Sequence, residues 1–169
     1  QAAYFVFDKG LYWGIPQKDL IRLEKNAGGK VKDKSAETVV VKTQYREHKD
    51  VEEIFSFVNK ELSAVEYTVN YYTNVNNTEM YIEDYQQLVS DLTESYGKPV
   101  NEGYNWKITD PTLKSGFETQ NKKGLAVSMG YLEAEASWKF EGKNMAVNVL
   151  LFSPKGLKAA IKVTYSQLQ

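Results

Sequence analysis

The clearest secondary-structure signal in the chain is the stretch TEMYIEDYQQLVSDLTESYGKP, residues 78–99. Its apolar side chains recur every three or four positions, as Ile82, Tyr85, Leu88, Val89, Leu92 and Tyr96. That spacing predicts an amphipathic helix over 79–96, with one face against a core. We expect Thr78 to cap the start of this helix, and Gly97 and Pro99 to end it.

Segments in which apolar and polar residues alternate, the pattern of half-buried strands, make up much of the remaining chain. Antiparallel strands are predicted at 65–71, 134–141, 144–152 and 157–166, a further strand at 38–45, and hairpin turns at 59–61 and 141–143. A shorter helix is expected after Trp13-Gly14, with Pro16 at its first position and Gly28 beyond its end. Residues 98–123 are interpreted mostly as a surface loop with a short strand near 104–108. Residues 121–129 are either a strand or a short helix ended by Gly130, and the helix is favoured.

The chain also contains a weak internal repeat. Four residues near one predicted turn recur near another, so that Phe57, Lys60, Leu62 and Ala64 match Phe152, Lys155, Leu157 and Ala159. The predicted fold class is therefore α+β: a tandem pseudo-repeat of one helix followed by about three antiparallel strands, with the helices packed on one face of the sheet. We expect a single compact domain over 1–169, possibly built from two fused pseudo-repeats at 1–74 and 75–169.

Composition argues against several classes of function. Basic and acidic residues number 21 and 22, and only Arg22 and Arg46 are arginines, so we expect no nucleic-acid partner. Cysteine is absent, which excludes disulfides and thiolate chemistry. No apolar run reaches the roughly 18 residues of a membrane span, so no transmembrane segment is predicted.

Catalytic signatures are equally scarce. His48 is the only histidine and lies in a charged stretch, where an exposed loop position is expected. Ser95 and Lys98 have the spacing of the serine-x-x-lysine motif, but that motif needs its serine at a helix start and Ser95 is predicted at a helix end. Acidic pairs such as Glu83-Asp84 are expected on solvated faces. We therefore predict a protein that is not an enzyme, with no catalytic residue, cofactor or metal site.

Aromatic residues are the one unusual resource, because the chain has 12 tyrosines, 7 phenylalanines and 3 tryptophans. Most of them fall on predicted core faces. Four lie off those faces or in predicted loops and are the candidate binding surface: Tyr72, Tyr81, Tyr104 and Trp106. Exposed tyrosine and tryptophan are enriched at binding surfaces because they bury a large area at little entropic cost.

Two short motifs point to a family. The sequence WGIPQKDL at 13–20 and the helix stop SYGKP at 95–99 resemble signatures of uncharacterised exported proteins and lipoproteins of Gram-positive bacteria. The repeated helix-and-strand layout is similar to the beta-lactamase inhibitory protein and to the SmpA/OmlA (BamE-type) envelope lipoproteins. The resemblance implies a protein that works outside the cytoplasm and binds a partner without catalysis.

The leading hypothesis is thus a non-enzymatic, extracytoplasmic binding protein, whose unknown partner is another protein or a component of the cell envelope. A glycan- or small-ligand-binding module that uses exposed aromatics is the alternative, and a small hydrolase is the third. A large pocket rimmed by aromatics favours ligand binding, whereas a broad exposed surface favours a protein partner.

Overall fold

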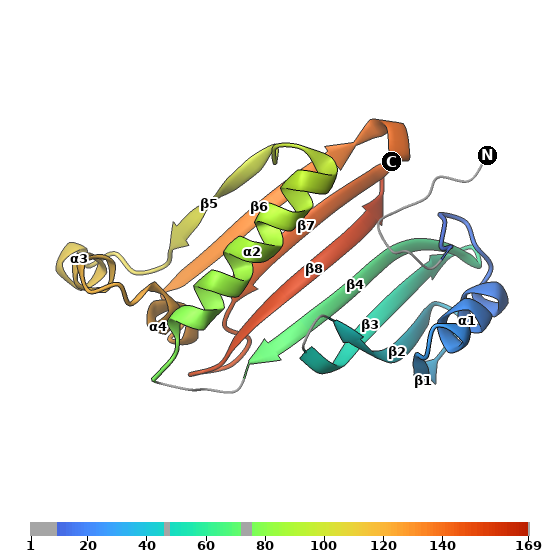
Figure 1. The fold of residues 1–169 in the computed structure, drawn as a ribbon, viewed down its shortest axis with the longest axis horizontal. Helices are drawn as coiled ribbons and strands as arrows, with labels where there is room; N and C mark the ends of the chain where they lie inside the picture. Colours follow the sequence, from blue (N-terminus) through green and yellow to red (C-terminus); the bar gives the residue numbers. More distant parts are fainter. Residues whose placement is uncertain (1–9, 46–47, 72–75, 169) are drawn as a thin grey trace. The chain divides into compact units, whose positions relative to one another are not determined.

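The computed structural model describes residues 10–45, 48–71 and 76–168. Within these ranges the protein is α+β, with four α-helices and an eight-stranded antiparallel sheet. In chain order the elements are α1 (Gln17–Asn26), β1 (Lys30–Lys34), β2 (Thr38–Tyr45), β3 (His48–Val58), β4 (Glu61–Tyr71), α2 (Glu79–Tyr96), β5 (Asn101–Trp106), α3 (Pro111–Thr119), α4 (Lys123–Ser128), β6 (Leu132–Phe140), β7 (Met145–Phe152) and β8 (Ala159–Gln167). The strand order is β1-β2-β3-β4-β8-β7-β6-β5 (Figure 1).

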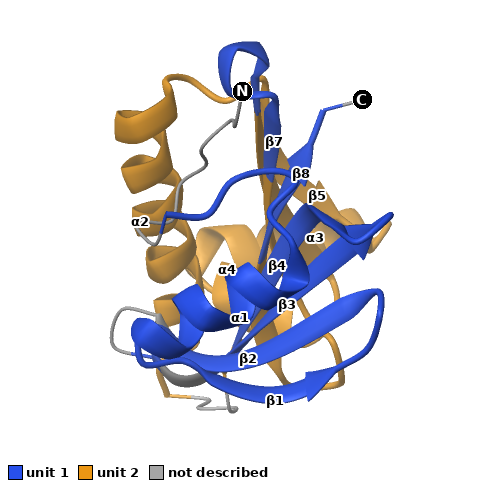
Figure 2. Cartoon of the chain, turned by 90° about the vertical axis from the view of Figure 1, so that its right-hand side faces the viewer, with its two compact units in different colours: residues 1–69, 139–147, 163–169 blue, residues 70–138, 148–162 orange. Residues whose placement is uncertain are grey.

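The chain divides into two compact units, coloured separately in Figure 2. Unit 1 comprises residues 1–69, 139–147 and 163–169, and unit 2 comprises 70–138 and 148–162. In unit 1, α1 packs against β1 and β2. In unit 2, the residue that follows α2 is bonded to β6, because the Trp138 indole N–H donates to the Gly97 carbonyl, and the start of α2 contacts α4 (Figure 1). The two units therefore each contain helices and strands.

The predicted long helix and the predicted strands are confirmed. The helix spans 79–96, and the strands at 65–71, 134–141, 144–152 and 157–166 correspond to β4, β6, β7 and β8. Along β4 the residues expected to face the core are all buried, and the rings of Tyr67 and Tyr165 stack with centroids 6.3 Å apart. The predicted strand at 157–166 differs from β8 at its first residue. Leu157 precedes β8, has a positive φ of 60° and is 53% exposed.

The predicted hairpin turns are also confirmed. Asn59 and Lys60 both have positive φ, at 52° and 67°, as a two-residue turn between twisted strands requires. The connection from β6 to β7 is a short 3₁₀ turn at Glu141–Lys143, followed by Asn144 in the left-handed conformation. Short turns of this kind keep consecutive strands antiparallel and adjacent.

The ends of the helices differ in detail from the expectation. Thr78 makes no side-chain capping hydrogen bond, since its backbone is already helical there. Pro16 is the residue before α1, with an extended ψ of 148°, and so is not the first helical residue. Gly97 does end α2 with a positive φ of 83°, a conformation that glycine adopts without steric cost.

The interpretation of 98–123 as mostly surface loop is wrong. This segment contains β5 and α3. The carboxylate of Asp110 accepts hydrogen bonds from the backbone N–H groups of Thr112 and Leu113, at 2.9 and 3.3 Å, and Pro111 occupies the first helical position. The Asp-Pro pair is therefore a helix start and not a loop turn. The expected helix within 121–129 is confirmed as α4.

Candidate functional site

A cleft lies between α2 and β5 in unit 2 and has a volume of about 450 Å³. Its lining, which defines the α2–β5 cleft, consists of Tyr85, Gln86, Val89, Ser90, Glu102, Gly103 and Tyr104. The helical residues come from two adjacent rows of α2, because positions four apart lie one above the other on a helix. The β5 residues reach the cleft because β5 ends the strand order and pairs with β6 alone among the described strands.

Tyr104 is the predicted binding residue that the structure places at this cleft. It is 38% exposed, and its hydroxyl accepts a hydrogen bond of 3.2 Å from the Gln86 side chain. The Lys123 ammonium lies 4.6 Å from the centre of its ring, within the range of a cation–π interaction. These contacts hold the ring in place while leaving a large part of it accessible to a partner.

Tyr85 supplies a buried polar group beside Tyr104. Its side chain is 4% exposed, and its hydroxyl has no hydrogen-bond partner among the residues that the structure describes. Burial, together with the nearby negative charge of Glu102 and Glu135, raises the pKa of this hydroxyl well above its usual value. The group is therefore a neutral donor in the physiological range, next to the cleft that a partner could enter.

Replacing Tyr85 by phenylalanine is expected to raise the free energy of unfolding by about 1 kcal/mol, because a buried hydroxyl without a partner is removed. The effect of pH provides a second signature. An unfolded tyrosine loses its proton near pH 10 while the folded one retains it, so the wild type loses stability as the pH rises above about 10. The Tyr85→Phe variant should lose less stability than the wild type over the same rise in pH. Urea unfolding of both proteins at neutral and alkaline pH checks this, and a variant less stable at neutral pH contradicts it.

A second, shallower hollow lies around β5. Its volume is about 300 Å³, and it is lined by residues 101–105 with Glu135 and Ser137. Gly103 pairs with Glu135 of β6. A Cβ atom placed on Gly103 would meet no atom within 4 Å, so open space adjoins the strand here. We call this hollow the Gly103 notch.

The other predicted binding residues have different surroundings. Trp106 is half-buried, with its ring 6.4 Å from that of Phe117 and the Lys114 ammonium 5.8 Å from its centre. Tyr81 is fully buried, with its ring 5.1 Å from that of Tyr71, so the expectation that it is exposed is wrong. It lies four residues before Tyr85 and thus on the same helix face, a spacing that predicts burial. Tyr72 lies outside the described residues.

Sequence reasoning missed several residues of the site. Gln86 lies outside the apolar face of the predicted helix, but its side chain donates a hydrogen bond to Tyr104. Gly103 carried one usable signal, because glycine inside a strand often marks a close approach or an open position on the sheet. The role of Tyr85 could not be read from the sequence, since a tyrosine on an apolar helix face is an ordinary core residue.

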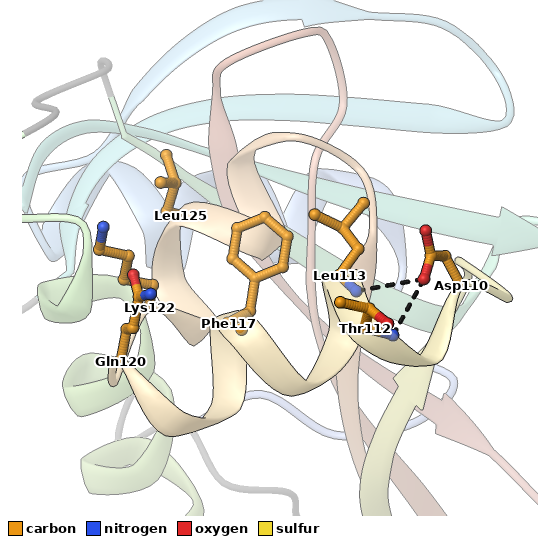
Figure 3. Close-up of a pocket in the computed structure, with 8 residues that line it drawn as sticks. Asp110, Thr112, Leu113, Phe117, Gln120, Lys122 and Leu125 are labelled. Carbon is orange, nitrogen blue, oxygen red and sulfur yellow. Dashed lines mark hydrogen bonds between the residues drawn. The ribbon is translucent and has the colours of Figure 1, made fainter.

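A third hollow, the α3–α4 pocket, has a volume of about 420 Å³. Leu113, Phe117 and Leu125 follow one another across it, with Asp110 at one end and Lys122 at the other (Figure 3). Leu113 is 42% exposed, which gives the pocket an accessible apolar wall. The Asp110 carboxylate already accepts two backbone hydrogen bonds from α3.

The candidate catalytic residues Ser95 and His48 lie on different elements. Ser95 lies at the end of α2, as predicted. His48 begins β3, where it pairs with Tyr45 of β2, and it is half-buried, so the expectation of an exposed loop position is wrong. Over the described ranges, no group of three or more histidine, aspartate or glutamate side chains is arranged to hold a metal ion. In the same ranges, no helix is both long enough and apolar enough to cross a membrane.

Comparison with known proteins yields no relative. No family model, no curated protein and no solved structure matches the chain significantly. The α+β class is thus defined by the structure itself.

Proposed function

We propose that the protein is a non-enzymatic binding protein and that its partner is another protein, bound along β5 of unit 2. The observation that carries this proposal is the exposure of β5. Five of its six residues are exposed, and the sixth, Trp106, is half-buried. An aromatic side chain, Tyr104, stands on this strand between the α2–β5 cleft and the Gly103 notch. Such a surface offers both an anchor and an extended contact area.

A protein partner is favoured over a glycan because a lysine lies over one face of each of the two aromatic rings. The Lys123 ammonium lies over the ring of Tyr104, and the Lys114 ammonium lies over that of Trp106. A sugar that stacked on the lysine-covered side of either ring would have to displace the lysine. A partner protein can instead use the ring edges, the hydroxyl of Tyr104 and the exposed backbone of β5.

The proposal includes a location outside the cytoplasm. Its support is the resemblance of residues 13–20 and 95–99 to motifs of exported proteins. Fractionation of cells that express the full-length gene product tests it, and recovery in the cytoplasm alone contradicts it.

We also propose that the chain arose by duplication, with α1 and α2 covering the same face of the sheet. In support, the described elements form two series of one helix and four strands, α1 with β1–β4 and α2 with β5–β8, where α3 and α4 lie between β5 and β6. Each series thus has four strands, not the three expected. The matched residues differ locally, since Leu62 is buried in β4 and Leu157 is exposed before β8.

Selection from a displayed library of random peptides tests the binding function. The full chain is expected to enrich peptides whose binding is at least about fivefold weaker with Tyr104→Ala, since loss of a central aromatic typically costs about 1 kcal/mol or more. Tyr12→Ala in unit 1 is the matched control and should bind as the wild type does. Enrichment of no peptide, together with binding on a glycan array, would overturn the protein partner in favour of the glycan.

A small apolar ligand in the α3–α4 pocket is the second candidate. Its volume falls within the range of roughly 300–1,000 Å³ that is typical of ligand sites. Leu113 provides an exposed apolar wall and Lys122 a cation at the rim. A fragment screen by NMR with the wild type and Leu113→Asp tests this function independently of β5.

A further inference from the structure

Half of the backbone hydrogen-bonding groups of β5 point away from β6. In an antiparallel pair, alternate residues direct both their N–H and C=O groups at the neighbouring strand. Lys107 N–H donates to the Tyr131 carbonyl at 2.7 Å, in the register that pairs Trp106 with Leu132. Odd-numbered residues of β5 therefore face β6, while Glu102, Tyr104 and Trp106 direct their backbone groups at the free edge.

Between Asn101 and Trp106 the free edge of β5 lacks the features that usually protect an edge strand. An irregularity lies at the start of β5, where the Val100 N–H donates to the Ser137 carbonyl at 2.8 Å although Asn101 is the residue that pairs with Ser137. Proteins commonly prevent strand addition with lysine, proline, a bulge or a covering element. The sequence of β5, NEGYNW, contains no lysine or proline, and its pairing with β6 is continuous from Asn101 to Trp106. Among the described strands β5 pairs only with β6, and its residues remain exposed. The edge is therefore open to another extended chain.

The two hollows flank this edge strand. In an extended chain successive side chains point to opposite faces of the sheet. Glu102 and Tyr104 share the face of the α2–β5 cleft, as their partners Ala136 and Ala134 are buried there. Gly103 and its partner Glu135 belong to the opposite face. An added strand would thus direct alternate side chains into the cleft and into the Gly103 notch.

The charge at the notch is negative. Glu133 is paired with Lys107 at 3.5 Å, whereas Glu135 accepts a hydrogen bond of 3.2 Å from the neutral Asn148 side chain. No cation of the described residues forms an ion pair with Glu135 or Glu102. Because Gly103 has no side chain, a residue on the added strand opposite Gly103 can extend across it towards the Glu135 carboxylate. The distance is about two strand spacings, or ~10 Å between the two backbones, which a long basic side chain and a glutamate bridge together.

We infer that β5 binds an extended segment of the partner protein as an added strand, with a lysine or arginine of that segment lying over Gly103 and pairing with Glu135. This inference rests on the proposed function and specifies the partner segment. Backbone hydrogen bonds to Glu102, Tyr104 and Trp106 supply affinity, and the notch selects the basic side chain. The side chains on either side of the basic residue face the α2–β5 cleft.

The test uses the full chain and a capped peptide, Thr-Val-Thr-Lys-Thr-Val-Thr, with a matched peptide in which glutamate replaces the lysine. Binding is followed by NMR, through the hydrogen exchange of individual backbone amides. The lysine peptide should slow the exchange of the Glu102, Tyr104 and Trp106 amides at least tenfold. The amides of Asn101, Gly103 and Asn105 already face β6 and should change less.

Three variants separate the effect of charge from that of strand addition. Glu135→Gln should weaken the lysine peptide about two- to fivefold, the range of an exposed ion pair, without affecting peptides that lack a basic residue. Glu102→Pro removes one outward N–H group and should abolish binding, whereas Glu102→Ala keeps that group and should retain it. Protection of the β6 amides from exchange shows whether Glu102→Pro remains folded. If it does not, the exchange measurement on the wild type still tests strand addition.

The outcomes are distinct for the two proposals. Peptide binding that depends on Tyr104 but leaves the Glu102, Tyr104 and Trp106 amides unchanged overturns strand addition and leaves the proposed function intact. Equal binding of the lysine and glutamate peptides overturns the charge preference. Slowed exchange of the same amides at high protein concentration without peptide identifies a second copy of the chain as the occupant and overturns the partner proposed here. Failure of every displayed peptide to bind overturns both proposals.

Discussion

Trp138→Ala is expected to lower the free energy of unfolding by about 3–5 kcal/mol, a large part of the total stability of a domain. Trp138 lies in β6, is 1% exposed, and is among the largest fully buried side chains. Its indole N–H donates a hydrogen bond of 2.8 Å to the Gly97 carbonyl at the end of α2. Truncation therefore leaves a cavity and removes a contact that holds the end of the helix on the strand. Urea unfolding monitored by circular dichroism measures the change.

Trp138→Phe is the matched control, since it keeps an aromatic ring but loses the N–H donor. It should cost less than the alanine variant, with about 1 kcal/mol arising from the lost hydrogen bond. If alanine and phenylalanine cost the same, cavity formation is not the main effect. A cost below 1 kcal/mol for alanine would contradict the central position of Trp138 in the core of unit 2.

Gly124→Ala is expected to destabilise the protein by about 3 kcal/mol or to displace α4 from α2. A Cβ atom at Gly124 would lie 1.9 Å from the Thr78 carbonyl oxygen and 2.9 Å from the Glu79 nitrogen. Both are backbone atoms, so the clash cannot be relieved by a side-chain rotation. The Gly124 N–H also donates a hydrogen bond of 2.8 Å to the Glu79 carboxylate, which fixes the close approach of α4 to the start of α2.

Gly116→Ala in α3 is the control for the Gly124 variant. A Cβ atom at Gly116 would meet nothing within 4 Å, so alanine should stabilise the helix by about 0.5–1 kcal/mol. Glu79→Ala separates the hydrogen bond from the clash and should cost about 1 kcal/mol. Thermal unfolding of the three variants measures these changes in stability. A Gly124→Ala protein as stable as the wild type would show that α4 can move away from α2 at no cost.

The parts of the fold that could be predicted from the sequence are those in which a helical or alternating pattern of apolar residues continues over many positions. The helix over 79–96 repeats its apolar side chains over five turns, and β4 and β8 alternate over most of their lengths. β5 was found only in part, because an exposed edge strand has no buried face and so shows little alternation. α3 was missed because Asp110-Pro111 has the composition of a turn, and only its hydrogen bonds identify it as a helix start.

The candidate site was predictable only through Tyr104. Its partners come from α2, far away in sequence, and the approach of Gln86 to its hydroxyl depends on how α2 and β5 pack in unit 2. Tyr81 shows the opposite case, since its four-residue spacing from Tyr85 indicates burial, whereas we predicted it to be exposed. The sequence does not show that Gly103 pairs with Glu135, because the register between β5 and β6 is set by tertiary packing.

The connection from β5 to β6, residues 107–131, limits how related sequences can vary in length. Trp106 pairs with Leu132, so both ends of the segment 107–131 are held together by the sheet, and its length has little effect on closing it. Its two helices are embedded unequally: α3 buries only Phe117, whereas α4 buries four of its six residues. Insertions and deletions are therefore expected to accumulate in 107–122, while 123–131 should keep its length. The stretch around α3 is then the natural place to graft a foreign loop without disturbing the domain.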